Sequence, residues 1–174
     1  GDVVINNVIP THLEAISAKL MESGAQVIEG DDGRDFFIRV SSNSRARAVN
    51  IKTLPYPGFP TDLQQPMMAY LSTAQGNSFV VENIFEDRFN HVAELQRMGA
   101  NITLNARTAM IEGVAQLSGA PLFATDLRAG AALIVAALAA EGQSQVHNIG
   151  YIDRGYEFFE QKLRALGADI KRVE

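Results

Sequence analysis

Two stretches without any charged residue limit the possible folds of this chain more than any other feature. Residues 63–81 and 129–140 contain no Asp, Glu, Lys or Arg. A helix without a polar face is buried, either in a membrane or in a protein core. The more apolar run, 129–140, is shorter than the ~20 residues that a membrane span needs. We therefore expect two helices buried in the core, each beginning near one of two Thr-Asp-Leu sequences.

The chain also repeats itself, which predicts the order of its elements. An apolar-x-Asn-apolar pattern occurs at residues 5–8, 81–84 and 146–149. Each copy precedes a predicted amphipathic helix that ends in Gly-Ala, where glycine suits the left-handed C′ position. The three terminal glycines are Gly24, Gly99 and Gly167. In the first helix Leu13, Ile16 and Leu20 are expected to face the core, and in the third Phe159, Leu163 and Leu166.

Predicted strands complete the repeated unit. Strand-like runs follow the glycines at residues 26–30, 101–105 and 169–173, and we expect hairpins that pair 35–40 with 48–53 and 108–114 with 120–125. Alternating strands and helices predict the α/β class. About two complete units are present, with one more divided between the ends. We expect residues 1–174 to form a single, incomplete domain of a larger enzyme, because stacked units cover one another's apolar faces.

Composition excludes several classes of function. A net charge of −5 argues against a general nucleic-acid or anionic-membrane binder. The chain has no cysteine, which rules out disulfides, a thiol nucleophile and a Cys-type zinc site within it. Its three histidines show no metal-ligand spacing, and His91 is expected to cap or line the second amphipathic helix. Without a signal peptide or a Gly-rich phosphate loop, the chain is predicted to be cytosolic and to need no metal or cofactor.

Three arginines lie at or near predicted helix starts: Arg88, Arg128 and Arg154. The partial positive charge of a helix N-terminus disfavours a cation there unless an anion neutralises it. An aspartate adjoins each arginine or precedes it by two residues, so local surface ion pairs of little energetic value are one interpretation. The repeated placement favours the other, in which the guanidinium groups hold a phosphate or carboxylate bidentately.

Two aspartates, Asp62 and Asp126, lie at the starts of the two uncharged helices. The simplest interpretation of either is an N-cap, which is worth about 1 kcal/mol. At Asp62 this role has a competitor, since Thr61 can cap as well. An aspartate at the mouth of an apolar core is also a candidate general base for a sugar hydroxyl. The sequence leaves both roles open.

Four longer motifs show a family resemblance. They are "PYPGFPTDLQ", "ENIFEDRFNHVAELQRMGA", "LSGAPLFATDLRAGAAL" and "IDRGYEFFEQKLRALGADI". Together they resemble the C-terminal portion of the UDP-N-acetylglucosamine enolpyruvyl transferase family, over essentially the whole chain. The resemblance implies an inside-out α/β barrel of βαβαββ units with buried helices, in an enzyme of two similar domains and about twice this length.

The resemblance also implies a reaction and a set of site residues. The family transfers the enolpyruvyl group of phosphoenolpyruvate to the 3-hydroxyl of UDP-N-acetylglucosamine, the first committed step of peptidoglycan synthesis in the bacterial cytoplasm. Asp62 matches the carboxylate that faces the sugar hydroxyl, and Ile84 matches a main-chain contact with the nucleotide sugar. The positions implied around phosphoenolpyruvate are Arg88, Asp126, Arg128 and Arg154.

Other parts of the family's site are implied to lie in the other half of the enzyme. These are a Lys-Asn pair, a loop cysteine that donates a proton and a further arginine, and Tyr151 stands where many relatives have histidine. We therefore expect the isolated chain to be inactive and to bind substrate weakly. Its expected partners are the missing N-terminal domain or, through an exposed strand edge, a second copy.

Three other functions compete with this one. The shikimate-pathway enolpyruvyl transferase shares the fold and the donor but not the sugar acceptor, and "NIFEDRF" and "IDRGYE" favour the nucleotide-sugar enzyme. A non-catalytic binding module built from repeats remains open, because no complete catalytic set is present. An RNA-phosphate cyclase is disfavoured by the net charge.

Overall fold

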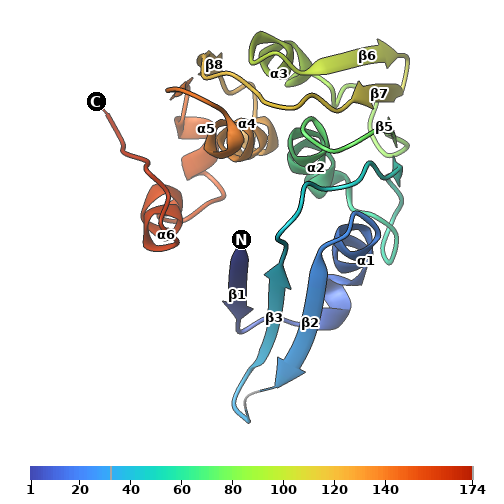
Figure 1. Cartoon of the computed structure of the whole chain (residues 1–174), viewed down its shortest axis with the longest axis vertical. Helices are drawn as coiled ribbons and strands as arrows, with labels where there is room; N and C mark the ends of the chain where they lie inside the picture. Colours follow the sequence, from blue (N-terminus) through green and yellow to red (C-terminus); the bar gives the residue numbers. More distant parts are fainter. Residues whose placement is uncertain (32, 174) are drawn as a thin grey trace.

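The computed structural model describes residues 1–31 and 33–173, and its first part is an antiparallel sheet with a helix beside it (Figure 1). The strands lie in the order β1-β3-β2, with Val4 opposite Arg39 and Ile28 opposite the same residue. Helix α1 contacts β2. The elements are β1 (Asp2–Asn6), η1 (Pro10–His12), α1 (Glu14–Glu22), β2 (Gln26–Asp31) and β3 (Phe36–Ser41).

The middle of the chain forms one βαβαββ unit. Its sheet has the order β4-β5-β7-β6, in which β4 and β5 are parallel and β7 is antiparallel to both of its neighbours. The elements are β4 (Ile51–Lys52), η2 (Thr61–Leu63), α2 (Gln64–Leu71), β5 (Asn77–Val81), α3 (Val92–Arg97), β6 (Asn101–Asn105) and β7 (Thr108–Glu112).

The last part contains a parallel strand pair and three helices. Strands β8 and β9 pair in parallel, and helix α5 packs against α4. Figure 1 shows α6 set apart from the other helices, on the side where the chain ends. The elements are β8 (Pro121–Phe123), α4 (Leu127–Ala139), β9 (Gln145–His147), α5 (Gly150–Asp153) and α6 (Phe159–Ala165).

The two uncharged stretches form helices that pack against each other at the centre of the fold (Figure 1). Met68 and Leu71 of α2 and Leu133 of α4 are fully buried, so the prediction of buried helices is confirmed. Helix α4 also has an exposed apolar edge, where Val135 and Leu138 are 37% and 45% exposed. No helix of the described residues is long and apolar enough to cross a membrane.

Both predicted hairpins are wrong. Residues 48–53 do not pair with β3; Ile51 and Lys52 pair in parallel with β5, and β8 pairs in parallel with β9 instead of with β7. The true hairpins are β2-β3 and β6-β7, because the runs after the helix-terminal glycines fold back on the next run in the sequence. Each later strand then opens the parallel strand-helix-strand crossover that contains a buried helix.

The helix ends are confirmed and one strand is not. Gly24, Gly99 and Gly167 have φ values of 104°, 91° and 95°, as the left-handed C′ position requires. Residues 169–173 form no strand, because no described strand lies beside them to share hydrogen bonds. Leu166 is 62% exposed, so the prediction that it faces the core is wrong as well. It is the C-cap of α6, a short helix with no buried residue.

Candidate functional site

The two Thr-Asp-Leu sites meet through an ion pair between Asp62 and Arg128. Asp62 lies in the 3-10 turn η2, and Arg128 lies in the first turn of α4. The Arg128 Nε donates to Asp62 Oδ1 at 2.5 Å across 66 residues of sequence. The two side chains are 26% and 63% exposed, so the pair contributes little to stability. Asp62 thus supplies the negative charge that the arginine at this helix start needs.

Asp126 is the N-cap of α4. Its backbone is extended (φ −156°, ψ 176°), and its Oδ1 accepts from the amides of Arg128 at 2.8 Å and Ala129 at 3.1 Å. The capping interpretation is therefore confirmed for Asp126. Neither Asp62 nor Thr61 caps the turn before α2. The Thr61 hydroxyl instead donates to the buried carboxylate of Glu82 at 2.9 Å, which is why the expectation that Thr61 can cap is wrong.

Arg88 approaches this region from the loop before α3. Its carbonyl accepts a hydrogen bond from the Gln65 side chain of α2 at 3.1 Å. Its guanidinium carbon lies 4.1 Å from the centroid of the Phe85 ring, a cation–π contact that fixes the charged group. Arg88 lies four residues before Val92, the first residue of α3, and so stands outside the helix.

Arg154 lies at the end of a helix rather than at a start, which corrects the sequence prediction. It is the C-cap of α5, where the helix dipole favours a cation without any added anion. Its predicted partner Asp153 pairs with Arg172 at 2.5 Å, and hydrogen bonds from that guanidinium lower the pKa of Asp153. Arg154 itself makes no ion pair with another described residue.

The backbone beside Arg154 nevertheless packs on the start of α4. A Cβ added to Gly155 would lie 2.6 Å from Cδ1 of Leu127, the first residue of α4. One helical turn further, a Cβ on Gly130 would lie 2.4 Å from Cγ1 of Ile152. These close approaches hold the segment that carries Arg154 against the helix end that carries Arg128.

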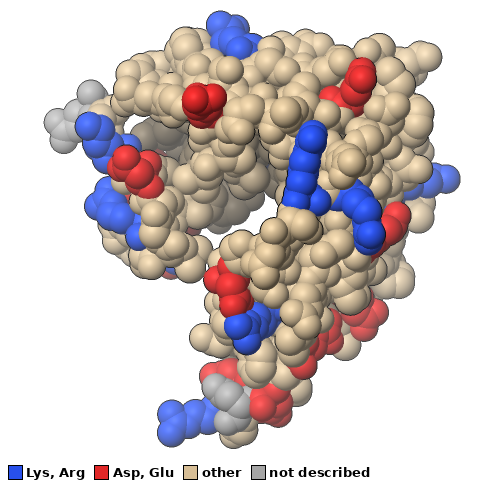
Figure 2. Space-filling model, in the orientation of Figure 1, with Lys and Arg blue, Asp and Glu red and all other residues tan. Residues whose placement is uncertain are grey.

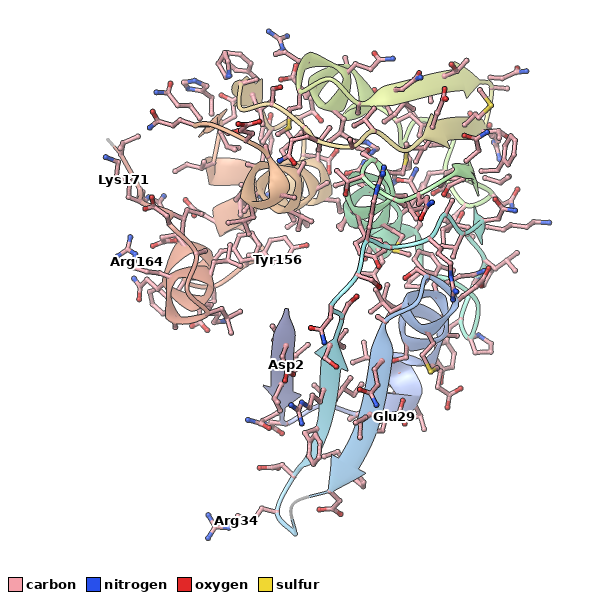
Figure 3. All side chains as sticks on the ribbon, in the orientation of Figure 1. Asp2, Glu29, Arg34, Tyr156, Arg164 and Lys171 are labelled. Atoms are coloured by element: carbon pink, nitrogen blue, oxygen red, sulfur yellow. The ribbon has the colours of Figure 1, made fainter. Side chains whose placement is uncertain are left out.

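Tyr156 is a site candidate that the sequence reasoning missed. It lies between α4 and α6 (Figure 3), and its ring stacks on Phe159 at a centroid distance of 4.9 Å. Burial raises the pKa of its hydroxyl, the charge of Arg128 lowers it, and the carboxylates of Asp62 and Asp126 raise it. The phenol therefore shares the electric field of the ion pair and of the helix cap. In the sequence, the feature that could have identified Tyr156 as a site residue is its position directly after Arg154 and Gly155.

Ile84 and Asp62 share the wall of a cavity of about 300 Å³. The Ile84 amide donates to Glu82 at 2.8 Å, which leaves the carbonyl as the main-chain group available to a ligand. The cavity lies between the start of α1 and the Pro-rich loop before η2, and the other residues that line it include His12, Ile16, Leu54, Tyr56, Pro57 and Gly58.

His91 is at the N-cap position of α3 but does not cap, so the capping alternative is wrong. The ring is completely buried and neither of its nitrogens has a hydrogen-bond partner among the described residues. Burial lowers the pKa of His91 to about 4, against the opposing charge of Asp126. No group of three or more His, Asp or Glu side chains in residues 1–31 and 33–173 could hold a metal ion.

Comparisons with known proteins agree with the resemblance. The sequence model of the EPSP synthase (3-phosphoshikimate 1-carboxyvinyltransferase) family matches residues 1–163. The chain is 57% identical over 173 residues to UDP-N-acetylglucosamine 1-carboxyvinyltransferase 2 of Carboxydothermus hydrogenoformans, covering 99% of this chain and 41% of that protein. It is 56% identical to UDP-N-acetylglucosamine 1-carboxyvinyltransferase of Desulfofundulus thermocisternus, covering 99% of this chain and 70% of that protein.

Solved structures show the same fold. The enolpyruvyl transferase NikO from Streptomyces tendae has a TM-score of 0.79 and 29% identity, over 91% of this chain and 36% of that one. EPSP synthase from Acinetobacter baumannii has a TM-score of 0.70 and 17% identity, over 99% of this chain and 40% of that one. A likeness at this identity shows the fold alone. The chain spans about two fifths of the length of the first curated relatives. It belongs to the EPSP synthase family of carboxyvinyl transferases, and the two relatives named above that share more than half of its residues are UDP-N-acetylglucosamine 1-carboxyvinyltransferases.

Proposed function

We propose that this chain is part of an enzyme that transfers the enolpyruvyl group of phosphoenolpyruvate to the 3-hydroxyl of UDP-N-acetylglucosamine. One observation carries the proposal. Asp62 and Arg128, 66 residues apart and each matching a family position, meet at 2.5 Å beside a helix cap and a cavity. The identity of more than half with relatives named for this reaction supports the choice of acceptor.

In this proposal Asp62 receives the proton of the sugar hydroxyl. The hydrogen bond from Arg128 holds the Asp62 carboxylate in place, and 63% exposure of the Asp62 side chain leaves room for a substrate beside it. The hydroxyl oxygen then bonds to C2 of phosphoenolpyruvate while C3 gains a proton. Loss of a proton from C3 and cleavage of the bond between C2 and the phosphate oxygen then release phosphate and restore the double bond.

The arginines bind the charged donor. Phosphoenolpyruvate carries a phosphate and a carboxylate on three carbons, and fixed guanidinium groups stabilise charge that develops on them. Arg128 exchanges part of its bond to Asp62 for a substrate oxygen, while Arg88 and Arg154 approach from neighbouring segments. Asp126 fixes the backbone of Arg128 through its cap.

The described part of the chain holds only a share of the site. The chain has no cysteine to donate a proton, and it spans about two fifths of the first curated relatives. We propose that residues 1–174 form one domain of the inside-out barrel type and that a second domain of the same bacterial, cytoplasmic enzyme completes the site. Phosphate release by the isolated chain at the rate of a complete enzyme would contradict this part.

The test is phosphate release by the full-length enzyme that contains this segment. We expect release with UDP-N-acetylglucosamine and none with shikimate 3-phosphate, and a loss of at least a hundredfold in kcat for Asp62→Asn. Asp2→Asn is the matched control, because Asp2 is also an exposed aspartate paired with an arginine, on β1. Equal activity of Asp62→Asn and Asp2→Asn would refute the role of Asp62.

The shikimate-pathway reaction is the second candidate, favoured by the description of the matching family model. Turnover of shikimate 3-phosphate in the same assay would establish it. A non-catalytic binding module is the third, and it gains support only if Arg128→Ala and Arg154→Ala leave turnover unchanged.

A further inference from the structure

Glu82 is a buried acid that holds four hydrogen-bond donors. It follows β5 and is 1% exposed. Its Oε1 accepts from the Thr53 hydroxyl at 2.8 Å and from the amides of Ile84 at 2.8 Å and Phe85 at 3.1 Å. Its Oε2 accepts from the Thr61 hydroxyl at 2.9 Å. A buried carboxylate is costly unless it is hydrogen-bonded, and these charge-assisted bonds offset that cost.

The four donors come from three separate segments. Thr53 follows β4, Thr61 begins η2, and Ile84 and Phe85 belong to the loop after β5. Strands β4 and β5 are parallel, so their carboxyl ends meet, and the Thr53 amide donates to the Val81 carbonyl there. The carboxyl ends of parallel strands are where α/β folds bind ligands. Glu82 therefore joins three segments at the edge where a site is expected.

Two of the three segments lead to residues of the proposed site. Thr61 directly precedes Asp62, and Ile84 is itself a site residue. The Phe85 ring carries the guanidinium of Arg88 at 4.1 Å. One carboxylate thus reaches both the residues assigned to the sugar and an arginine assigned to the anion.

Building on the function proposed above, we propose that Glu82 is a positioning residue that fixes Asp62 and Ile84 on the sugar side of the site and Arg88 on the anion side. It touches neither substrate and acts through its hydrogen bonds. Glu82→Gln keeps the shape of the side chain but turns one acceptor oxygen into an NH₂ donor, which faces donors that it cannot satisfy. The segments held by Glu82 then lose their common anchor.

Three variants of the full-length enzyme separate this role from general stability. Glu82→Gln is expected to raise the KM for UDP-N-acetylglucosamine and the KM for phosphoenolpyruvate at least tenfold each. Thr61→Val removes only the hydroxyl next to Asp62, so only the KM for the nucleotide sugar rises. Phe85→Leu removes only the ring under Arg88, so only the KM for phosphoenolpyruvate rises. The matched control is Glu112→Gln, an exposed glutamate of β7, which leaves both unchanged.

The outcomes distinguish this proposal from the function on which it rests. If the unaltered enzyme does not use UDP-N-acetylglucosamine, the proposed function fails. If it does, and a folded Glu82→Gln leaves both KM values unchanged, the role of Glu82 is overturned. If Glu82→Gln does not fold, Thr61→Val decides, because it removes one hydrogen bond to Glu82: a rise in the KM for the nucleotide sugar alone supports the proposal, and no rise, or an equal rise in both KM values, overturns it.

Discussion

The cap of α4 gives the sharpest stability prediction, through Asp126→Ala. The change removes the acceptor of two amide donors, and one of them belongs to Ala129, which is completely buried. Loss of an N-cap side chain costs about 0.5–2 kcal/mol, and loss of a negative charge at a helix N-terminus costs about 0.3–1 kcal/mol more. We expect the free energy of unfolding to fall by about 2 kcal/mol.

Two further variants separate the cap from the charge. Asp126→Asn keeps an acceptor oxygen and loses only the charge, so it should cost about 0.5 kcal/mol. Asp62→Ala removes an aspartate that also lies near this helix start, but Asp62 is exposed and does not cap. It should therefore change the free energy of unfolding by less than about 0.5 kcal/mol.

The assay is urea unfolding of this chain, followed by far-UV circular dichroism and checked by thermal melting. For a domain of this size, a loss of 2 kcal/mol lowers the Tm by about 4–8 °C. The reasoning is refuted if Asp126→Ala has the same Tm as the unaltered chain, or if Asp62→Ala lowers the Tm as much as Asp126→Ala does. Equal losses for Asp126→Asn and Asp126→Ala would show that the charge, rather than the hydrogen bond, stabilises the helix.

Two other predictions concern packing and pH. An added Cβ at Gly113 would lie 1.7 Å from the Ala74 carbonyl oxygen, so Gly113→Ala should lower the free energy of unfolding by about 3 kcal/mol or more. Gly150→Ala is the control: an added Cβ there meets open space, so the free energy of unfolding should not fall. His91 has a pKa of about 4 when folded and about 6.5 when unfolded, so stability is lost as pH falls through this range, by about 2 kcal/mol between pH 7 and 5. His91→Asn should remove this loss, whereas the control His147→Asn, which changes an exposed histidine, should keep it. Urea unfolding at pH 7 and at pH 5 gives the free energy of unfolding of each variant. An equal change of this free energy with pH in both variants would contradict the prediction.

The sequence predicted the buried helices because absence of charge is a direct signal of burial. It predicted Gly24, Gly99 and Gly167 as helix ends because only glycine enters the left-handed region freely. It also predicted that Arg128 needs an anion. The identity of that anion within the chain, Asp62, could not be read from the sequence, since the two residues are 66 positions apart and meet only through the packing of α2 on α4.

The site residues that were missed are those whose role depends on neighbours. Glu82 looks like one of many surface acids in the sequence. Its partners Thr53, beside the parallel pair of β4 and β5, and Thr61, at the start of η2, reach it only in the folded chain. The start of a helix at Arg154 was predicted wrongly because the motif around it contains both the end of α5 and the approach to α6. On the face shown in Figure 2, basic and acidic side chains are interspersed, so the charges on that face do not mark a site.

Strand pairing was the least predictable level, and the middle unit shows the reason. There β7 lies between β5 and β6, so β6 has hydrogen-bond partners only because β7 is beside it. By chain order β9 corresponds to β5, and residues 169–173 correspond to β6. Each of the latter two follows a helix that ends in glycine: α3 and Gly99 precede β6, and α6 and Gly167 precede residues 169–173. No described segment takes the place of β7 beside them, and a strand without a neighbour leaves its amides to water. The residues at 169–173 have the composition of a strand, but a strand forms only where a partner supplies the other half of each hydrogen bond.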